Sequence, residues 1–407
     1  MKPGPDPATM HRVTPGTRQL AEPSLLFTAF EPSGDEHASI IIAELRRRHP
    51  TLPIHAWGGP RMERAGATLV ERTGDDAVIG IPGLKKIREH LRTMARINRW
   101  LKKNPATVLV PVDSPGANDP ICDLAKAQGL RVVHLVAPQI WAWGRWRIKR
   151  LRRRTDLLLC LFDFEVRFFG KRDVPARYIG HPIFDVPLDL PVLDREAQGF
   201  PSGRPRLAMF PGSRPDEIVK HFPLLMDVFR DLKARHAEAV AVVAATGPAT
   251  ERLIRDLAAR HGGWPEGMRV EAGKADAIIR WCDLCLVKSG TITLQIARQI
   301  KPMVVFYRKG NPLLFLLAKT ILATKVFSLP NVLARRRIVP ELVPHFGGAD
   351  AIVRAADALL RSPEAMERQR NDLRQVVAPF MAGRAASRAA DAIEEVAGIR
   401  REATTAA

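Results

Sequence analysis

The segment best suited to bind a charged ligand is Leu207–Glu217, which reads LAMFPGSRPDE. Its apolar residues 207–210 predict a buried strand that ends at a Pro-Gly turn. Ser213 lies three residues before an acidic residue, and a proline occupies the first turn, a spacing typical of a capped helix start. Gly212 permits a tight turn, the helix start offers free N–H groups, and Arg214 adds a planar cation. These features predict a binding site for a phosphate or diphosphate, called here the diphosphate seat. The alternative is a helix cap that binds no ligand.

A second group that could do chemistry is Asp113, which directly follows the apolar run 108–112. A carboxylate at the end of a buried strand can take a proton from a substrate hydroxyl. An Asp that precedes Ser-Pro is also typical of a turn or helix cap, so that reading stays open. His181 and His134 are alternatives as the general base, although His134 lies within an apolar strand and is expected to be a core residue.

Two similar junctions between a strand, a turn and a helix occur elsewhere in the sequence. In one, the apolar run Ser24–Phe30 precedes EPSGDE, where Ser33 and Glu36 have the spacing of a capping box. In the other, Leu284–Val287 precedes a Ser-Gly-Thr turn at residues 289–291. Because ligands bind beyond the carboxyl ends of parallel strands, these turns are candidates for binding sites.

The alternation of strands and helices through both halves of the chain predicts parallel βαβ units. The expected fold class is α/β, with two Rossmann-like, doubly wound domains that face a central cleft, and a length of 407 residues agrees with two domains. The predicted division is a disordered tail over residues 1–22, a first domain over 23–190, a linker over 191–206, a second domain over 207–385, and a C-terminal helix with a frayed end over 386–407.

The chain is strongly basic, with a formal net charge of +20. Such a charge implies an anionic partner: nucleic acid, an anionic membrane surface or a phosphorylated substrate. The four cysteines form no disulfide framework and suggest a reducing compartment. Cys282 and Cys285 form a CxxC pair, but without a second pair they favour structural packing over a redox or metal role.

Several enzyme classes lack their signatures in this sequence. There is no GxxxxGK phosphate loop and no GxGxxG dinucleotide fingerprint. No HExxH or clustered His and Cys residues suggest a catalytic metal, and Ser213 lacks the GxSxG context of a hydrolase nucleophile. A diphosphate seat in one half and a strand-end carboxylate in the other suit a nucleotide-sugar transferase, in which Asp113 would deprotonate the acceptor hydroxyl.

The segment Gln139–Arg154 combines tryptophans with basic residues. Three of the seven tryptophans fall within six residues, and seven of the ten residues 145–154 are Lys or Arg. This composition suits an anionic membrane interface or single-stranded nucleic acid, but no nucleic-acid-binding motif supports the second reading. The helix predicted at Lys85–Lys103 and the apolar run Pro312–Leu329 are further candidates for a membrane-facing surface, a solvated basic helix being the alternative for the first. The longest nearly uncharged apolar run, Pro312–Ala318, is well short of the roughly 20 residues that span a bilayer.

Ten short motifs occur from Glu31 to about Val343, in an order that is far more specific than any one of them. They are EPSGD at Glu31–Asp35, WGGPRM at Trp57–Met62, VIGI at Val78–Ile81, VDSPGAN at Val112–Asn118, QIWAWGRWRI at Gln139–Ile148, CLFDFE at Cys160–Glu165, YIGHP at Tyr178–Pro182, PGSRPDEI at Pro211–Ile218, SGTITLQ at Ser289–Gln295, and SLPNVLARRRIVPEL at Ser328–Leu342. In this order the motifs resemble the lipid-A-disaccharide synthase family of inverting glycosyltransferases.

The resemblance implies a glycosyltransferase of the B type that joins two acylated glucosamines. The implied donor is UDP-2,3-diacylglucosamine, the acceptor is 2,3-diacylglucosamine 1-phosphate, and the products are the β-1,6-linked disaccharide phosphate and UDP, with no metal ion or cofactor. Both substrates are anionic lipids, so the basic surfaces are expected to hold the protein peripherally on the cytoplasmic face of the inner membrane. The resemblance leaves a homodimer open and implies no nucleic-acid partner.

The junctions and the resemblance together define the expected site. The family's base falls on Asp113. The donor-binding residues would be Gly212, Ser213, Arg214, Ser289, Gly290, Thr291, Gln295 and Asn331. The residues at the cleft and acceptor side would be Glu31, Ser33, Gly34, Asp35, Trp141, Trp143 and Arg147.

Three departures from the family's pattern bear on the substrates. Gln295 stands where the family usually has Glu, which would replace a charge-assisted hydrogen bond by a neutral one at a cost of about 1 kcal/mol. Gly116-Ala117 replaces the usual Asp-Phe beside the base, and Gly144 replaces the usual Arg after WAW. A divergent relative that uses another lipid acceptor, or a catalytically impaired membrane-associated paralogue, is therefore the alternative.

Overall fold

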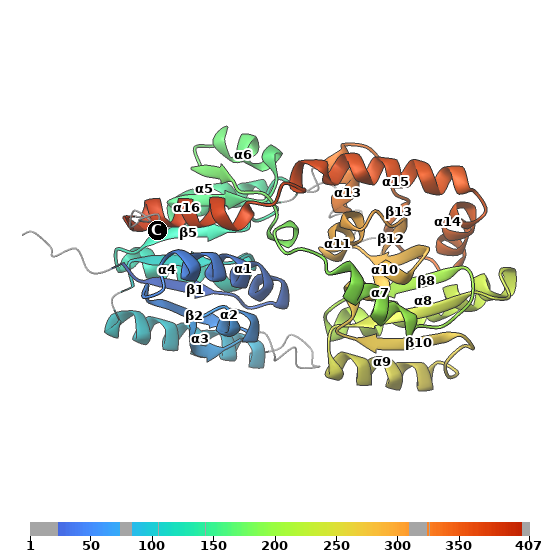
Figure 1. The fold of residues 1–407 in the computed structure, drawn as a ribbon. Helices are drawn as coiled ribbons and strands as arrows, with labels where there is room; N and C mark the ends of the chain where they lie inside the picture. The colour runs from blue at the N-terminus through green and yellow to red at the C-terminus, as the bar shows by residue number, and fades with distance from the viewer. Residues whose placement is uncertain are drawn as a thin grey trace, which may run out of the picture.

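The structure is a computed structural model that describes residues 23–73, 84–104, 106–142, 144–308, 324 and 326–400. Within them the chain forms two separate parallel β-sheets, each with helices on both faces (Figure 1). We call the first sheet with its helices the first lobe and the second sheet with its helices the second lobe. The expected tail, the VIGI motif, Trp143, most of Pro312–Leu329 and the last seven residues lie outside the described residues.

The first sheet has seven strands in the order β3-β2-β1-β4-β5-β6-β7, and its described strand pairs are parallel. Its central strands are continuous apolar runs, as expected for strands covered on both faces. The strands are β1 Leu25–Thr28, β2 Ile54–Gly58, β3 Thr68–Arg72, β4 Val108–Pro111, β5 Arg131–Leu135, β6 Leu157–Cys160 and β7 Ala176–Tyr178. The helices are α1 Pro32–Arg48, α2 Pro60–Arg64, α3 Leu84–Lys103, α4 Pro115–Ala127, α5 Ile148–Arg154 and α6 Asp163–Gly170.

The second sheet has six parallel strands in the order β10-β9-β8-β11-β12-β13. These strands are β8 Arg206–Phe210, β9 Val240–Ala245, β10 Met268–Ala272, β11 Leu284–Lys288, β12 Met303–Arg308 and β13 Glu341–His345. The remaining helices are α7 Leu190–Gln198, α8 Pro215–Arg235, α9 Pro248–Arg260, α10 Ala275–Trp281, α11 Ile292–Arg298, α13 Leu329–Ala334, α14 Asp350–Leu360, α15 Pro363–Val377 and α16 Ala385–Ala397.

Both sheets reverse their strand order at one point, and both reversals position the site. The first sheet grows outward in opposite directions from β1 and β4, and the second does the same from β8 and β11. At such a switch point the adjacent loops leave in opposite directions, which opens a crevice beyond the carboxyl ends of the strands. The two switch points therefore confirm the doubly wound architecture expected from the alternating pattern.

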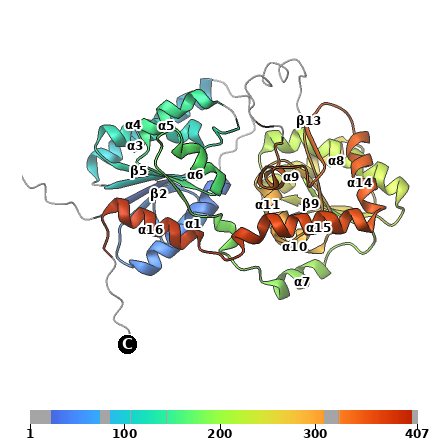
Figure 2. The same ribbon diagram turned by 90° about the horizontal axis from the view of Figure 1, so that it is seen from above.

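The chain passes between the lobes twice (Figure 1). The first connection leads from β7 into α7, so the segment expected to be a linker is partly helical. The second leads from α15 to α16, and α16 returns to the first lobe, where it packs against α1 (Figure 2). Asp185 on the first connection accepts hydrogen bonds from the backbone N–H groups of Arg384, Ala385 and Ala386, which caps α16 and ties the two connections together.

Both capping boxes expected from the sequence are wrong. Helix α1 begins at Pro32 and α8 begins at Pro215, and neither has a hydrogen bond from the side chain of its N-cap residue. Proline at the first helical position moves each helix start, so Ser33 falls inside the first turn and Ser213 falls before the cap. Glu217 replaces the expected serine cap, because its Oε2 accepts a hydrogen bond from the Ser213 N–H at 3.2 Å.

Candidate active site between the two lobes

Asp113 lies at the switch point of the first sheet, one residue beyond the Val112–Leu135 bridge. Asp113 and Ser114 both have left-handed backbones, with φ of 47° and 43°. Two consecutive non-glycine residues in this region cost on the order of 1–2 kcal/mol each, so the surrounding structure must hold them there. The turn therefore places Asp113 just beyond the end of the strand at an energetic cost.

Asn118 provides much of the restraint on this turn. It is fully buried, and its Nδ2 donates to the carbonyl oxygens of Val112 at 3.0 Å and Asp113 at 2.8 Å. Its Oδ1 accepts from the Thr28 hydroxyl at 2.7 Å. One amide thus joins the end of β1 to the turn after β4, and it is a positioning residue that sequence analysis did not single out.

The environment of Asp113 suits a general base. Burial raises the pKa of its carboxyl, and the negative charge of Glu31 acts in the same direction. A hydrogen bond from the Ser114 backbone and the positive charge of Arg214 lower it, but burial dominates and the net pKa is raised. A carboxylate with a raised pKa is a stronger base than an ordinary aspartate.

Arg214 lies at the switch point of the second sheet and contacts the first lobe directly. Its Nη2 donates to Glu31 Oε2 at 2.5 Å, and its Nη1 lies 3.6 Å from Glu217 Oε1. Glu217 Oε1 in turn accepts from Lys288 Nζ at 2.7 Å. A ladder of alternating charges, Glu31–Arg214–Glu217–Lys288, therefore runs from the turn after β1 to the end of β11.

The ladder explains the glycine that precedes Arg214. Gly212 has φ of 130°, and a Cβ there would lie 2.6 Å from Glu217 Cβ. No side chain fits that position while Glu217 caps the turn. Burial alone would raise the pKa of Glu217, but hydrogen bonding and charge from Lys288 hold the pKa of this carboxyl below its usual range.

The Ser-Gly-Thr turn follows β11, beside the β8 turn. The Ser289 N–H donates to the carbonyl oxygen of Phe306 at 2.9 Å, and the Gly290 carbonyl accepts from the Thr293 hydroxyl at 2.7 Å. Helix α11 then begins at Ile292, one residue past Thr291, with the half-buried Gln295 in its second turn. The turn thus lies next to Lys288, the last residue of β11.

Asn331 is buried behind this region, and its side chain makes four hydrogen bonds. Its Nδ2 donates to the Val339 carbonyl at 3.1 Å and to Glu341 Oε2 at 2.9 Å, and its Oδ1 accepts from the N–H groups of Ile338 and Val339. These bonds use both donors and both lone pairs of the amide. Glu341 also accepts from the backbone and hydroxyl of Ser328, so it organises the SLPN motif.

The EPSGD motif divides between two tasks. Glu31 meets Arg214, whereas Asp35 is buried and accepts three hydrogen bonds from the backbone at the start of α2, from Gly59, Arg61 and Met62. Gly34 is also buried, because α1 packs so closely that a Cβ there would lie 3.3 Å from Ala29 Cβ. The half-buried Ser33 lies between them in the first turn of α1.

Trp141 is held by a buried acid. Its Nε1 donates to Glu165 Oε1 at 3.1 Å, and its ring meets Phe164 edge-on at 5.0 Å between centroids. Burial raises the pKa of Glu165 to about 8, so this carboxyl is mostly protonated at neutral pH.

Gly144, which departs from the family's pattern, has a left-handed φ of 75°. A Cβ at this position would lie 2.9 Å from Arg147 Nε, which gives the glycine a structural reason.

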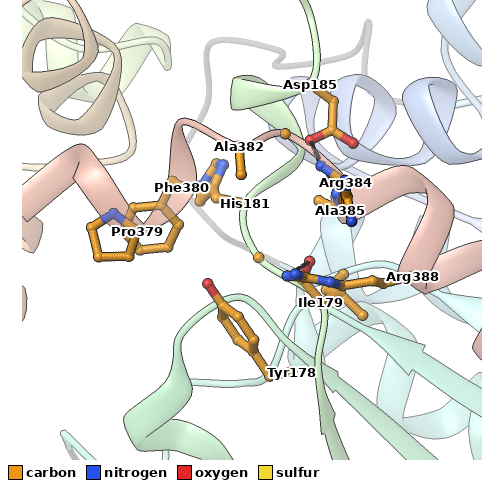
Figure 3. A pocket seen from close by; sticks show the side chains of 12 residues that line it. Tyr178, Ile179, His181, Asp185, Pro379, Phe380, Ala382, Arg384, Ala385 and Arg388 are labelled. Atoms are coloured by element: carbon orange, nitrogen blue, oxygen red, sulfur yellow. Dashed lines mark hydrogen bonds between the residues drawn. The ribbon is translucent and has the colours of Figure 1, made fainter.

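The alternative bases fit the chemistry less well than Asp113. His134 lies fully inside β5, and burial lowers its pKa to about 4. His181 is 2% exposed, and burial lowers its pKa well below the usual value. It borders a cavity of about 20 Å³ at the crossing between the lobes, lined also by Tyr178, Phe380 and Arg388 (Figure 3). That volume holds about one water molecule, not a sugar.

Two further findings concern ligands and membranes. In the part of the chain that the structure describes, no group of three or more His, Cys, Asp or Glu residues is arranged to hold a metal ion. None of the described helices has the length and apolar character needed to cross a membrane.

Cys282 and Cys285 are buried free thiols with sulfur atoms 3.3 Å apart, which agrees with the expected packing role.

The fold and its two facing switch points define a protein of the glycosyltransferase B class, in which nucleotide-sugar epimerases share the architecture. The structure is similar to the UDP-GlcNAc 2-epimerase of Neisseria meningitidis solved with UDP-GlcNAc (TM-score 0.65, 12% identity, 91% of this chain and 99% of that chain). It is also similar to a glycosyltransferase from Rickettsia africae (TM-score 0.56, 12% identity, 93% and 100%).

The sequence comparisons name the family within this class. Residues 25–394 match the family described as lipid-A-disaccharide synthetase. The lipid-A-disaccharide synthase of Anaeromyxobacter dehalogenans is 34% identical over 382 residues, which cover 93% of this chain and 97% of that protein. The chain belongs to the lipid-A-disaccharide synthetase family.

Proposed function

We propose that the protein is the hexosyltransferase that condenses UDP-2,3-diacylglucosamine with 2,3-diacylglucosamine 1-phosphate. The products are the β-1,6-linked lipid A disaccharide 1-phosphate and UDP. Membership of the lipid-A-disaccharide synthetase family supports the reaction. The residues proposed to carry it are those at the two switch points.

Asp113 is proposed to act as the general base. It would take the proton from the acceptor's hydroxyl as the oxygen attacks the anomeric carbon of the donor sugar. Burial and the raised pKa of the carboxyl favour this role, because they make Asp113 more basic without removing it from reach of a ligand. Attack from the face opposite the leaving group inverts the anomeric centre.

Arg214 is proposed to bind the diphosphate of the donor. As the bond between the sugar and the phosphate breaks, its electron pair goes to a phosphate oxygen, and a nearby guanidinium stabilises the added charge. The Gly212–Ser213 turn and the Ser289–Thr291 turn flank Arg214 at the carboxyl ends of β8 and β11. Asn331 would then act as a positioning residue that holds the SLPN motif, because its amide is already saturated.

The observation that carries the proposal is the direct contact between the two switch points. Arg214 from the second sheet reaches Glu31 from the first, and both influence the pKa of Asp113. This contact supports placing the proposed base and the proposed diphosphate-binding cation in one interdomain site, as a transferase that joins two sugars requires.

The direct test is a mass-spectrometric assay of the purified protein with the two diacylglucosamine substrates. The expected result is a disaccharide monophosphate and one equivalent of UDP. Release of UDP without the disaccharide, or no turnover with this pair while another lipid acceptor is glycosylated, would contradict the proposed substrate pair.

The protein is also proposed to bind an anionic bilayer at the cytoplasmic face of the inner membrane. Helix α3 carries Leu91 at 61% exposure among many basic residues, and Trp146, in the basic segment before α5, is 64% exposed. Exposed apolar side chains among cations suit an anionic interface. Co-sedimentation with anionic vesicles that is lost at high salt and absent with neutral vesicles would support membrane binding. The homodimer remains a prediction, which sedimentation velocity of the purified protein would test.

A further inference from the structure

The ion pair between Glu31 and Arg214 joins the two lobes at the proposed diphosphate seat. Its 2.5 Å contact is made by side chains that are 32% and 54% exposed, so solvent and solutes reach both groups. On the other side of the guanidinium, Glu217 is 11% exposed and held by Lys288 at 2.7 Å. Arg214 thus has one fixed acidic neighbour, in its own lobe, and one accessible partner from the opposite lobe.

A carboxylate and a phosphate are interchangeable partners for arginine. Both present oxygen pairs that match the fork of the guanidinium, but a diphosphate carries more charge and more acceptor atoms. An exposed ion pair is worth little in water, so it gives way readily to a stronger ligand. Glu31 therefore has the chemistry and the accessibility of a partner that an incoming diphosphate can replace.

We propose that Glu31 holds Arg214 in the place of the donor's diphosphate and is displaced when the nucleotide sugar binds. The exchange rests on the proposed function, because it takes Arg214 as the diphosphate ligand. It frees the Glu31 carboxylate at the mouth of the first switch point and pairs Arg214 with the donor instead.

The exchange couples donor binding to the base. The charged groups that act on Asp113 come from two elements: Glu31 from the turn after β1 and Arg214 from the turn after β8. Glu165 on α6 also faces Asp113, but its raised pKa of about 8 keeps it mostly uncharged at neutral pH. With the diphosphate on Arg214, the cation that stabilises the Asp113 carboxylate is neutralised while the Glu31 charge remains. Asp113 is then a stronger base when a donor is present, which favours removal of the proton from the acceptor's hydroxyl.

The test is a calorimetric titration of UDP into the full chain and into Glu31→Gln. Removing the competing carboxylate should tighten UDP binding about two- to five-fold, the range that an exposed ion pair is worth. The matched control is Glu36→Gln, from the same helix start. Glu36 pairs with Arg61 at 2.8 Å, with side-chain exposures of 30% and 50%, but this pair lies within the first lobe. Its loss removes the same charge and should leave UDP affinity unchanged.

The Arg214→Ala background separates displacement from simple charge repulsion. There Glu31 has no guanidinium to occupy, so Glu31→Gln should change UDP affinity no more than Glu36→Gln does. Unchanged or weaker UDP binding in Glu31→Gln, or equal tightening with and without Arg214, would overturn the exchange. Failure of the unaltered protein to bind UDP, or full UDP affinity in Arg214→Ala alone, would instead overturn the proposed donor site.

Discussion

The turns at the two switch points do the same topological job by different physical means. In the β4–α4 turn, two consecutive residues, Asp113 and Ser114, have left-handed backbones, and the buried side-chain amide of Asn118 restrains the turn through hydrogen bonds to its carbonyl oxygens. The β8–α8 turn is held by side-chain charges, with Arg214 between two carboxylates. A general base must lie at a fixed distance from one substrate hydroxyl, so a rigid turn suits it. An anion-binding site must release one partner and bind another, so an exchangeable ion pair suits it.

The largest expected effect comes from removing the proposed base while keeping the turn. Asp113→Asn retains a side chain that tolerates the left-handed backbone, but it cannot accept the proton. We expect turnover to fall about 10³-fold, the scale of a lost general base, with UDP affinity within two-fold of the unaltered protein. Single-turnover rates and UDP calorimetry measure the two effects. Near-normal rates in this variant would remove Asp113 from its role and end the comparison.

The rigid turn itself is tested by Asn118→Ala. The substitution leaves the Thr28 hydroxyl and the carbonyls of Val112 and Asp113 without their partner. We expect the free energy of unfolding to fall by about 3 kcal/mol, because several buried polar groups lose hydrogen bonds. We also expect turnover to fall, because the turn that carries Asp113 loses its restraint. Urea denaturation and rate measurements below the unfolding range report both. A loss of UDP affinity larger than the loss of turnover would show that the two turns are not independently built.

The exchangeable seat is tested by Arg214→Ala. Loss of a charged hydrogen bond at a phosphate should weaken UDP binding by about 2 kcal/mol, or roughly 30-fold, with little change in thermal stability because the ion pair is exposed. Arg167→Ala serves as the control, because Arg167 forms an exposed ion pair with Asp163 on α6, and its loss should leave UDP affinity as it was. Calorimetric titration of UDP compares the two variants. A large drop in melting temperature in Arg214→Ala would mean that this turn, too, is rigid.

A pH dependence of the free energy of unfolding is expected from Glu165, a buried carboxyl that interacts with the charge of Asp113. Burial raises the pKa of Glu165 to about 8, so the folded state binds a proton there that the unfolded state loses above its ordinary value of 4.5. Stability from this group is therefore complete below pH 4.5 and is lost as pH rises toward 8, by at most about 1.4 kcal/mol per pH unit. Glu165→Gln should flatten that slope in urea denaturation curves recorded from pH 5 to 8. An unchanged slope would place the proton elsewhere.

The sequence predicted the α/β architecture, the two lobes and the positions of the turns that carry the proposed site residues, because these follow from periodicity and from residues next to one another in the chain. Apolar runs such as residues 207–210 and 284–287 became central strands, and Asp113 and Arg214 fell at the ends of the strands where the order reverses. The residue spacing gave wrong predictions for the helix caps, where a serine and a proline both favoured a helix start at nearby positions. The serine caps failed because α1 begins at Pro32, two residues earlier than a cap at Ser33 would place it, and α8 begins at Pro215, one residue later than a cap at Ser213 would place it.

Long-range partners were beyond the sequence. Lys288 could have been suspected from its position at a strand end, but nothing in the chain links it to Glu217, 71 residues away. The same holds for Glu31 and Arg214, which are separated by 183 residues. Asn331 matched a motif, yet whether its amide faces a ligand or the protein depends on where Ile338, Val339 and Glu341 fold.

By itself, the sequence determined which residue types stand beyond which strands, since a strand's end and its turn are local properties of the backbone. Only the tertiary structure decided which of those residues meet, which are saturated by the protein and which remain open to a ligand. The physical reason is that hydrogen bonds and ion pairs depend on distances of a few ångströms, and the chain sets those distances only when both lobes have folded and packed.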